Sequence, residues 1–399
     1  MRYQFCLRLI RLLLFLFLQK EEEYLGCCSR LRIIRTQKKS NVYKFYRLLE
    51  KDVKEVVVES DPPPDADSRC LGSACQGWMA YIRKKDCQVF LFNPLSSQKI
   101  ILPSIETLPT VKGVNRNGQS GLVESSMSVF GPHLRPVSPK IFSERVVSDV
   151  VLSSSPLDDD CIAVVTYGRD SEVAFCRIRD DPNCWTLLDS PFTTSGQIVY
   201  HSGKKLFYAL SDCSSKIEAW DLHNDPIKRF HFEEHQTEVL GGEPFPIYKR
   251  DKVKSKLRRR PERKDYLVYD HQSEELFVVT RHAYDEHDLL PNNKTTTFGI
   301  FKAVFIDDHL VKLQLLKKNS IGNLAIFLNG GYGGFTLSTT EFPELRPSSI
   351  YFADNRSCCY DTDSDWRYQD LVINDYKEDS IMDKINSISL LRSWFIPDA

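Results

Sequence analysis

The sequence predicts an all-β protein, and three observations support this fold class. Short segments in which apolar and polar residues alternate recur along the chain, as in Asn41–Leu48. These segments are rich in Val, Ile, Phe and Tyr, and turn-forming Gly, Asn, Asp or Pro residues separate them. Helical periodicity is rare after the first 40 residues, and we expect only one short helix, at Ser380–Leu391.

The alternating segments predict a series of strand pairs. Strands are expected at residues 41–48, 77–82, 87–92, 161–167, 173–178, 197–201, 206–210, 217–222, 265–270, 275–280, 297–305, 324–328, 334–338, 349–352, 371–376 and 391–396. They group into units of about 40 to 60 residues with about four strands each. This grouping indicates an irregular, Kelch-like β-propeller, with an array of β-sandwiches as the alternative.

Two further expectations follow from the predicted propeller. Large apolar side chains at the inward positions of its strands should form the core, and we assign Trp78, Trp220, Phe327, Ile350 and Phe352 to it. The first and last strands, at residues 42–48 and 391–396, should lie in one blade, because a shared blade protects two sheet edges.

The chain divides into an N-terminal leader at residues 1–40 and a propeller domain at residues 41–397. The apolar run of the leader, Leu12–Leu18, is shorter than the about 20 residues that a membrane-spanning helix needs, so membrane contact is the least favoured use. An organellar or secretory signal within residues 1–20 ranks above it. A leader without a targeting role, or an artefact of the gene model, ranks first. We therefore expect the protein in the cytoplasm or nucleus, with an organelle as the alternative.

The overall composition excludes several classes of protein. With 42% hydrophobic and 27% charged residues, the chain has ordinary globular usage, which argues against disorder and coiled coils. Its 53 basic and 54 acidic side chains leave a net charge of −1, so we expect no general attraction to nucleic acid or to anionic membranes. The twelve cysteines include no CxxC motif and are too sparse for a disulfide scaffold, so most should be reduced thiols.

Motifs for catalysis, cofactors and metals are weak. Asn329–Gly334 is glycine-rich but lacks the spacing of a phosphate loop, so a hairpin turn is favoured. Asp361–Asp365 begins like a calcium loop, yet Trp366 replaces the required glycine. His282–Asp288 offers metal-ligand types without the spacing of a metal motif, and a solvated polar loop is favoured. We therefore predict no catalytic residues, no cofactor, no metal site and no enzymatic activity.

A strongly basic run is the best candidate for a binding site. Between Lys249 and Lys264 the chain carries ten Lys or Arg residues and only two acidic ones. The candidate site residues are Lys256, Arg258, Arg259, Arg260, Arg263 and Lys264. They could contact an acidic partner or serve as a nuclear localisation signal, although an exposed loop that aids solubility is favoured. Nucleic acid is not an expected partner, because no aromatic stacking surface accompanies the run.

Motifs spread along the chain resemble one family. Segments similar to its first three blades, its most specific region and its end lie at residues 75–103, 150–186, 197–222, 320–354 and 394–397. Residues 41–397 thus resemble the plant KIB-type β-propeller domain, which is often found behind an F-box and is also described as a domain of unknown function. Within the specific region, Ile350–Phe352 is the segment that distinguishes this family best.

The resemblance implies a binding role and no chemistry. F-box members of this family are thought to be substrate receptors of cullin-type ubiquitin ligases, in which the F-box docks the Skp adaptor and the propeller holds the target. Residues 1–40 contain no proline and no recognisable F-box, so a Skp adaptor is not an expected partner. We therefore expect a non-enzymatic, protein-binding β-propeller of unidentified partner. An organelle-targeted propeller is the alternative, and a propeller hydrolase with a site in the central channel ranks last.

Overall fold

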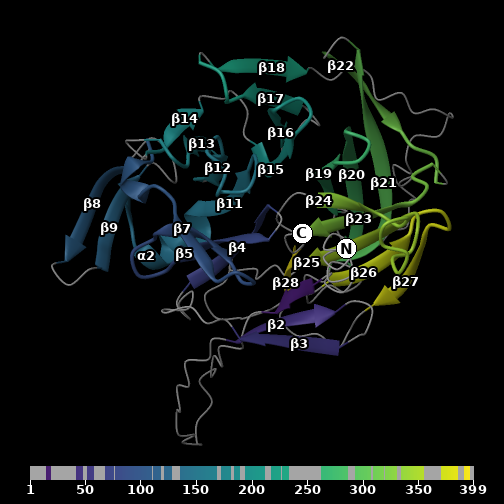
Figure 1. Cartoon of the computed structure of the whole chain (residues 1–399), viewed down its shortest axis with the longest axis horizontal. Helices are drawn as coiled ribbons and strands as arrows, with labels where there is room; N and C mark the ends of the chain where they lie inside the picture. Colours follow the sequence, from purple (N-terminus) through teal and green to yellow (C-terminus); the bar gives the residue numbers. More distant parts are fainter. Residues whose placement is uncertain are drawn as a thin grey trace, which may run out of the picture. The chain divides into compact units, whose positions relative to one another are not determined.

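The computed structural model describes residues 15–18, 42–47, 52–57, 68–75, 77–109, 111–117, 121–127, 135–168, 172–180, 184–188, 194–211, 217–225, 227–232, 262–285, 293–306, 309–318, 320–329, 334–354, 370–384 and 391–395. Figure 1 labels the strands and colours them along the sequence. The chain forms two compact units, which are described separately. Unit 1 comprises Met1–Val147, Asn183–Trp185 and Ile388–Ala399, and unit 2 comprises Ser148–Pro182 and Thr186–Ser387.

Nearly all regular structure in these ranges is β-strand, which confirms the all-β prediction. The helical turns are short. One is a 3-10 turn at Ile105–Thr107, and another is α2 (Pro139–Ile141), which continues into a π-helical turn at Phe142–Val146. No helix in the described ranges is long and apolar enough to cross a membrane.

Unit 1 contains two sheets whose strands follow one another in the chain. The first is a four-stranded sheet with the order β4 (Ser68–Cys75), β5 (Trp78–Arg83), β6 (Val89–Asn93) and β7 (Gln98–Ile101). Its middle strands are buried and apolar, whereas β7 is largely exposed, as an outer strand should be. The second is three-stranded and pairs β9 (Gly121–Met127) with both β8 (Val111–Asn117) and β10 (Arg135–Val137).

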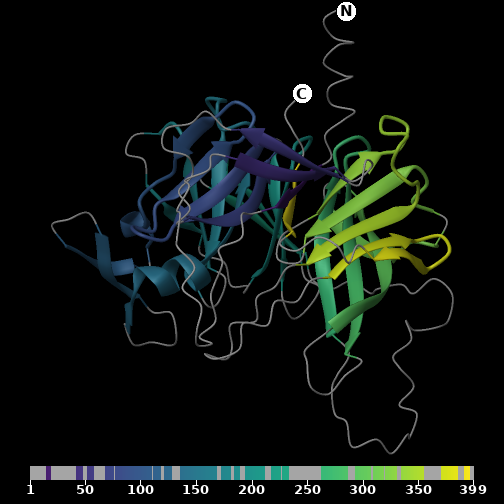
Figure 2. The ribbon, with the colours of Figure 1, turned by 90° about the horizontal axis from the view of Figure 1, so that it is seen from below.

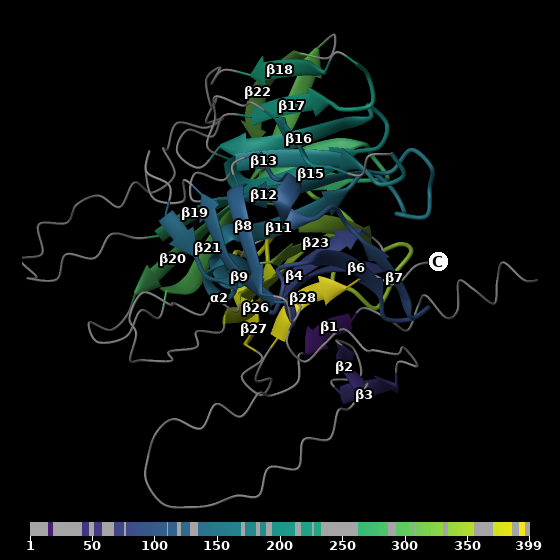
Figure 3. The same cartoon turned by 90° about the vertical axis from the view of Figure 1, so that its left-hand side faces the viewer.

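The third sheet of unit 1 joins the two ends of the chain (Figure 3). Its order is β28 (Leu391–Phe395), β1 (Phe15–Leu18), β2 (Val42–Arg47) and β3 (Asp52–Val57). The expectation that the first and last propeller strands share one sheet is therefore confirmed. They do not pair directly, because β1 lies between them and pairs antiparallel with both.

Unit 2 begins with two four-stranded sheets in chain order. The first consists of β11 (Val147–Leu152), β12 (Ile162–Tyr167), β13 (Glu172–Arg177) and β14 (Thr186–Leu188). The second consists of β15 (Thr194–His201), β16 (Leu206–Ser211), β17 (Ile217–Asp221) and β18 (Lys228–Phe232). They contain the strands expected for the second and third blades.

A nine-stranded sheet completes unit 2 (Figure 2, green to yellow). Its first four strands are β19 (Glu262–Asp270), β20 (Glu275–Asp285), β21 (Asn293–Ile306) and β22 (His309–Leu315). Its other strands are β23 (Leu324–Asn329), β24 (Gly334–Ser338), β25 (Ser349–Asp354), β26 (Asp370–Asp375) and β27 (Ser380–Lys384). The two groups meet where β19 and β24 pair in parallel, with Val268 opposite Gly334 and Tyr269 opposite Phe335.

Four hairpins share one turn design, in which a side chain caps the turn. The first turn residue accepts a hydrogen bond from the backbone N–H three residues later, at 3.0–3.2 Å, and the residue after that has a positive φ. The capping residues are Asn93, His201, Asp270 and Asp375, and the positive-φ residues are Ser97, Lys205, Glu274 and Asp379. Because the residue types differ, the repeat is visible in the geometry and not in the sequence.

The predicted core residues are all buried. Trp78, Trp220, Phe327, Ile350 and Phe352 are each at most 1% exposed. Ile350 and Phe352 belong to a cluster that fills the inside of the nine-stranded sheet, and Trp220 belongs to another that lies between the two four-stranded sheets of unit 2. The Phe327 ring stacks on Phe335 and Tyr351, with ring centroids 5.0 and 4.7 Å away.

The expected helix at Ser380–Leu391 is wrong in its first part. Residues 380–384 form β27, which pairs antiparallel with β26 across the turn at residues 376–379. The helical spacing of Ile381 and its neighbours was outweighed by the backbone hydrogen bonds of this hairpin, a tertiary effect that local propensity does not report.

Candidate functional site

The basic run reaches the described part of the chain only at its end. Lys256, Arg258, Arg259 and Arg260 lie outside the described residues. Arg263 and Lys264 were expected to lie in a loop. They belong instead to β19, because Glu262–Lys264 pair with residues 281–283 of β20. Successive strand residues point to opposite faces, so Arg263 and Lys264 contribute to different surfaces.

Arg263 belongs to a row of polar side chains that crosses three strands. In the register of the sheet, Arg263 of β19 lies opposite His282 of β20, which lies opposite Thr297 of β21. The guanidinium of Arg263 donates to both carboxylate oxygens of Asp265, at 3.2 and 3.1 Å. Thr280 donates to the same carboxylate at 2.6 Å. We call these five residues the polar row. The apolar face of β19, which carries Leu267 and Tyr269 in the core, therefore ends in hydrogen-bonding groups.

Burial and nearby charges set the pKa of His282. Burial is the main cause that lowers the pKa of His282, and the positive charges of Arg263 and Lys318 lower it further. Asp265 acts in the opposite direction. Since the pKa stays below its usual value, the imidazole is neutral at pH 7. Arg263 and Lys318 thus both favour the neutral imidazole, although each of them also pairs with a carboxylate, Asp265 and Asp379 respectively.

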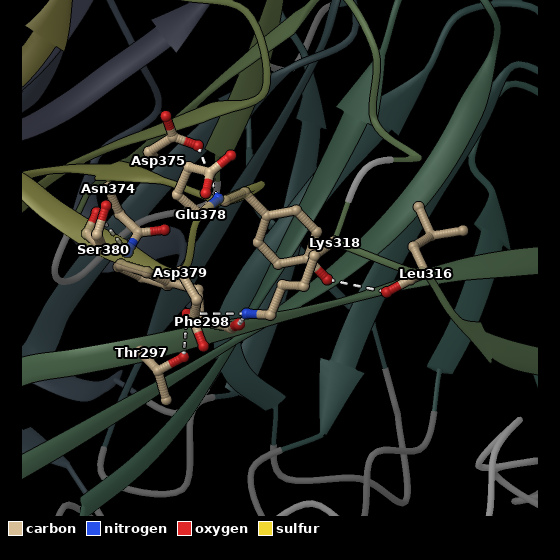
Figure 4. Close-up of polar contacts among 10 residues, drawn as sticks. Thr297, Phe298, Leu316, Lys318, Asn374, Asp375, Glu378, Asp379 and Ser380 are labelled. Carbon is tan, nitrogen blue, oxygen red and sulfur yellow. Dashed lines mark hydrogen bonds and ion pairs between the residues drawn. The ribbon is translucent and has the colours of Figure 1, made fainter.

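Lys318 ties three segments of the sheet together (Figure 4). Its Nζ donates to the carbonyl of Phe298 on β21 at 3.0 Å and to Asp379, in the turn after β26, at 2.9 Å. Asp379 also accepts from the hydroxyl of Thr297 at 2.7 Å. The Nζ of Lys318 lies 4.4 Å from the centre of the Tyr376 ring. We call Lys318, Asp379, Thr297 and Tyr376 the clamp.

Tyr376 shows that the clamp reaches into the core. Its ring is 1% exposed, and its hydroxyl donates to the carbonyl of Leu316 at 3.0 Å. Burial raises the pKa of Tyr376 to about 12, so the phenol stays protonated. Sequence reasoning missed the clamp because its members are far apart in the chain and belong to no local motif.

Lys264 and Arg281 occupy the other face of the same strands. They lie directly opposite each other, which brings two cations together beside the core. Arg281 is fully buried, its Nε donates to Thr295 at 2.7 Å, and its guanidinium lies 4.6 Å from the ring centre of Phe352. Lys264 lies 5.3 Å from the ring centre of Tyr266. Aromatic faces thus accommodate part of this positive charge.

A second polar cluster lies at the turns after β15, β17 and β19. His201 stacks against Tyr269, with ring centroids 4.4 Å apart, and Ser202 is hydrogen-bonded to the Tyr269 hydroxyl at 3.2 Å. Tyr200 and His223 are joined by a hydrogen bond of 3.0 Å. A Cβ on Gly203 would lie 2.4 Å from the Glu274 carboxylate, so the two turns touch. The cluster therefore holds neighbouring turns together.

The histidines and Tyr200 of this second cluster are neutral at pH 7. Burial is the main cause that lowers the pKa of His201, His223 and His271. Burial also raises the pKa of Tyr200 to about 12, and the charges of Asp160 and Asp221 add to this shift. His201 Nδ1 already accepts the backbone N–H of Lys204, so this nitrogen cannot also accept a proton from a substrate.

The weak metal and phosphate motifs of the sequence can now be compared with the structure. Asp361–Asp365 and His287 lie outside the described residues. His282 and Asp285 belong to β20, so the polar loop expected there begins later. The strands on either side of the glycine-rich segment pair antiparallel, with Leu328 opposite Gly334, which confirms the hairpin. Within the described ranges, no three His, Cys, Asp or Glu side chains are placed to hold a metal.

The following three solved structures resemble this chain at low sequence identity. The Cps50 (Swd1) β-propeller domain of Myceliophteria thermophila shares 11% identity over 81% of this chain and 86% of its own, with a TM-score of 0.32. Dihydro-heme d1 dehydrogenase NirN shares 9% over 94% and 73%, with a TM-score of 0.30. Aldose sugar dehydrogenase of Streptomyces coelicolor shares 12% over 65% and 89%, with a TM-score of 0.24. Likenesses this weak say nothing about what the chain binds.

The family of the chain is clear from its sequence profile. No curated protein matches it in sequence. Residues 45–373 match the profile of the KIB1-4 β-propeller, from within β2 to within β26, and so include β11 to β25 of unit 2 in full and the first part of β26. The resemblance read from the sequence motifs is thus confirmed, and the chain belongs to the KIB1-4 β-propeller family.

Proposed function

We propose that this chain is a non-enzymatic, protein-binding β-propeller and that the start of β19 is its contact for an acidic protein segment. The observation that carries the proposal is the position of Arg263 at the start of β19, where the basic run of the sequence enters the sheet. The Arg263 side chain is 55% exposed, so solvent reaches its guanidinium while it donates to Asp265. The remaining residues of the basic run precede it directly in the chain and add charge of the same sign.

The roles of the polar clusters support binding over catalysis. A hydrolase needs a nucleophile hydrogen-bonded to a base that is free to take its proton. His201 uses Nδ1 to cap a turn, and His223 is bonded to Tyr200, whose phenol has a raised pKa. The hydroxyls of Thr280 and Thr297 donate to carboxylates that hold other contacts. Each group therefore has a structural task.

The family extends the proposal to the type of partner. Because F-box relatives are thought to hold substrates for cullin-type ubiquitin ligases, we propose that this propeller likewise holds one protein target through its loops. The target would carry acidic residues that match the basic run. A pull-down with a Skp adaptor distinguishes a ligase subunit from a free-standing binding module. Recovery of the adaptor would indicate a ligase subunit, and its absence together with target recovery would indicate a free-standing binding module.

The experiment measures binding of a fluorescent polyglutamate peptide by anisotropy. We expect affinity that falls steeply as salt rises, because exposed charge pairs are screened within about 10 Å at 0.1 M salt. The variant R258E/R259E/R260E should abolish binding and leave the melting temperature unchanged. As a matched control, K85E/K140E/K228E makes the same charge change at exposed positions elsewhere. Equal loss in both variants, or no loss in either, would refute a specific site.

A second measurement separates protein binding from nuclear import. The same basic residues form a candidate nuclear localisation signal, which import receptors read in cells. A tagged R258E/R259E/R260E variant that leaves the nucleus but still binds the acidic peptide would assign the run to import. A variant that keeps its location and loses the peptide would support the binding site.

A further inference from the structure

The apolar run of the leader has a structural position that the sequence did not indicate. Phe15–Leu18 forms β1, the second strand of a four-stranded sheet, and it has a hydrogen-bonded neighbour on each side. On one side it pairs with β2 and on the other with β28. Residues 19–41 separate β1 from β2 in the sequence, so β1 joins the sheet through a long connection and not through a tight hairpin.

The sheet depends on β1 for its continuity. Without β1, the facing edges of β2 and β28 would both carry unpaired backbone N–H and C=O groups. The profile of the family spans residues 45–373 and therefore contains neither β1 nor β28. The chain thus closes this sheet with two strands from outside the family's common region.

The register indicates which kind of strand fits between β2 and β28. Leu16 lies opposite Tyr46 on one side and Trp394 on the other. Phe17 lies opposite Phe45 and Ser393, and Phe15 lies opposite Phe395 and Arg47. Aromatic and aliphatic residues at opposite positions are favourable cross-strand pairs, whereas an acidic or proline-containing segment would lose pairs or hydrogen bonds.

We propose that the space between β2 and β28 is a binding site for an extended apolar peptide, and that the chain's own Phe15–Leu18 occupies it. The peptide binds by adding a strand, with backbone hydrogen bonds for affinity and alternating apolar side chains for specificity. The occupant has only four strand residues, so few backbone hydrogen bonds hold it in place. Phe15–Leu18 cannot be a strand of this sheet and an exposed apolar segment at the same time.

The first experiment tests the cis arrangement in the full-length chain. Leu16 and Tyr46 are opposite residues on one face, so the pair L16C/Y46C should form a disulfide that mass spectrometry detects within one chain. In the matched control, L16C/F45C, the two thiols lie on opposite faces and should stay unlinked. No link in L16C/Y46C, equal linkage in both variants, or a link between two chains would overturn the proposal.

The second experiment tests the site with a ligand in trans. The full-length variant L16P/F17P cannot form β1, so it should bind a labelled peptide of residues 11–20 at least about tenfold more tightly than the unaltered chain, whose own strand competes. The same peptide with both prolines should bind neither protein. Equal binding by the variant and the unaltered chain, or binding by neither, would refute the site. If L16P/F17P does not fold, the cross-linking result still decides the cis arrangement.

Discussion

Two junctions join strands that are distant in the sequence, and they are built differently. In unit 2, β19 and β24 pair in parallel at Val268–Gly334 and Tyr269–Phe335. In unit 1, β1 pairs antiparallel along its whole length with β2 and with β28. The first junction has few backbone pairs, and the second has many. Backbone pairing alone therefore does not explain why the nine-stranded sheet holds together.

Side-chain contacts, some buried and some partly exposed, compensate for the few backbone pairs between β19 and β24. Asp270, at the end of β19, accepts a hydrogen bond of 2.5 Å from Thr336 of β24. The clamp links β21 to the turn after β26, and the Tyr376 hydroxyl reaches the carbonyl of Leu316. An apolar cluster fills the space between the two groups of strands. The β19–β24 junction is therefore held mainly by side-chain contacts, whereas the β1 junction is held by backbone pairing with β2 and β28.

The largest expected effect is at Gly334, where the two groups of strands meet. A Cβ there would lie 2.7 Å from the carbonyl oxygen of Phe327 and 2.8 Å from a methyl of Val268. Since a backbone atom cannot move aside cheaply, Gly334→Val should lower the free energy of unfolding by about 3 kcal/mol in denaturant titrations. Gly203→Ala is the control, because it meets only the flexible end of Glu274 and should change stability by less than about 0.5 kcal/mol. Similar losses in both variants would remove the distinction.

Asp270 should give the next largest effect, and it should depend on pH. Burial would raise its pKa, but the hydrogen bonds from Ser273, Thr336 and the backbone of Gln272 outweigh burial and lower it. A lowered folded-state pKa adds stability above the usual value of 3.8, and this stability is lost as the pH falls below it.

Asp270→Asn should therefore lower the free energy of unfolding by about 2 kcal/mol at pH 7, because a charged acceptor of two hydroxyls is lost. The loss should shrink as the pH falls from about 4 toward 2, since both proteins then carry a neutral group. Denaturant titrations at several pH values measure this. A loss that is the same at pH 7 and pH 2 would show that the charge of Asp270 does not hold the junction.

Lys318 should contribute less, because its ion pair with Asp379 is partly exposed. The exposed fractions of the two side chains are 39% and 44%, so water and salt screen the charges. Lys318→Met keeps an unbranched side chain of nearly the same length and removes the charge. It should lower the free energy of unfolding by about 1 kcal/mol, the sum of a weak ion pair and a cation–π contact with Tyr376. Lys377→Met, which removes the charge of a more exposed neighbour, should have no measurable effect.

Much of the strand pattern could be predicted from the sequence, and the reasons for the misses are physical. Strands in the middle of sheets alternate or are fully apolar, so β5, β6 and β12 were visible. Outer strands such as β7 are exposed and carry a weaker pattern. The expected helix at Ser380–Leu391 failed because β27 is such an outer strand, held by the hairpin with β26.

The candidate site could be predicted only in part, because its members meet through the fold. Arg263 belonged to a visible basic run, although the run was expected to continue as a loop where β19 begins. Lys318 and Asp379 have no local signal. They come together because the turn after β26 reaches β21 (Figure 4). The capping residues of the hairpins were hidden for another reason, since Asn, His and Asp perform the same task with different atoms.

The smallest expected effect concerns these hairpins, and its sign is stabilising. Lys205 is exposed and has a φ of 55°, a conformation that costs a residue with a Cβ about 1 kcal/mol. Lys205→Gly removes this strain but increases the freedom of the unfolded chain, so the net gain should be about 0.5 kcal/mol in the free energy of unfolding. Gly322 provides the mirror test, because it has a φ of 57° and no atom lies within 4 Å of an added Cβ. Gly322→Ala should lower stability by about 1 kcal/mol through backbone strain alone. If Lys205→Gly destabilised the protein while Gly322→Ala behaved as expected, the Lys205 side chain itself would have to hold a contact that outweighs its strained backbone.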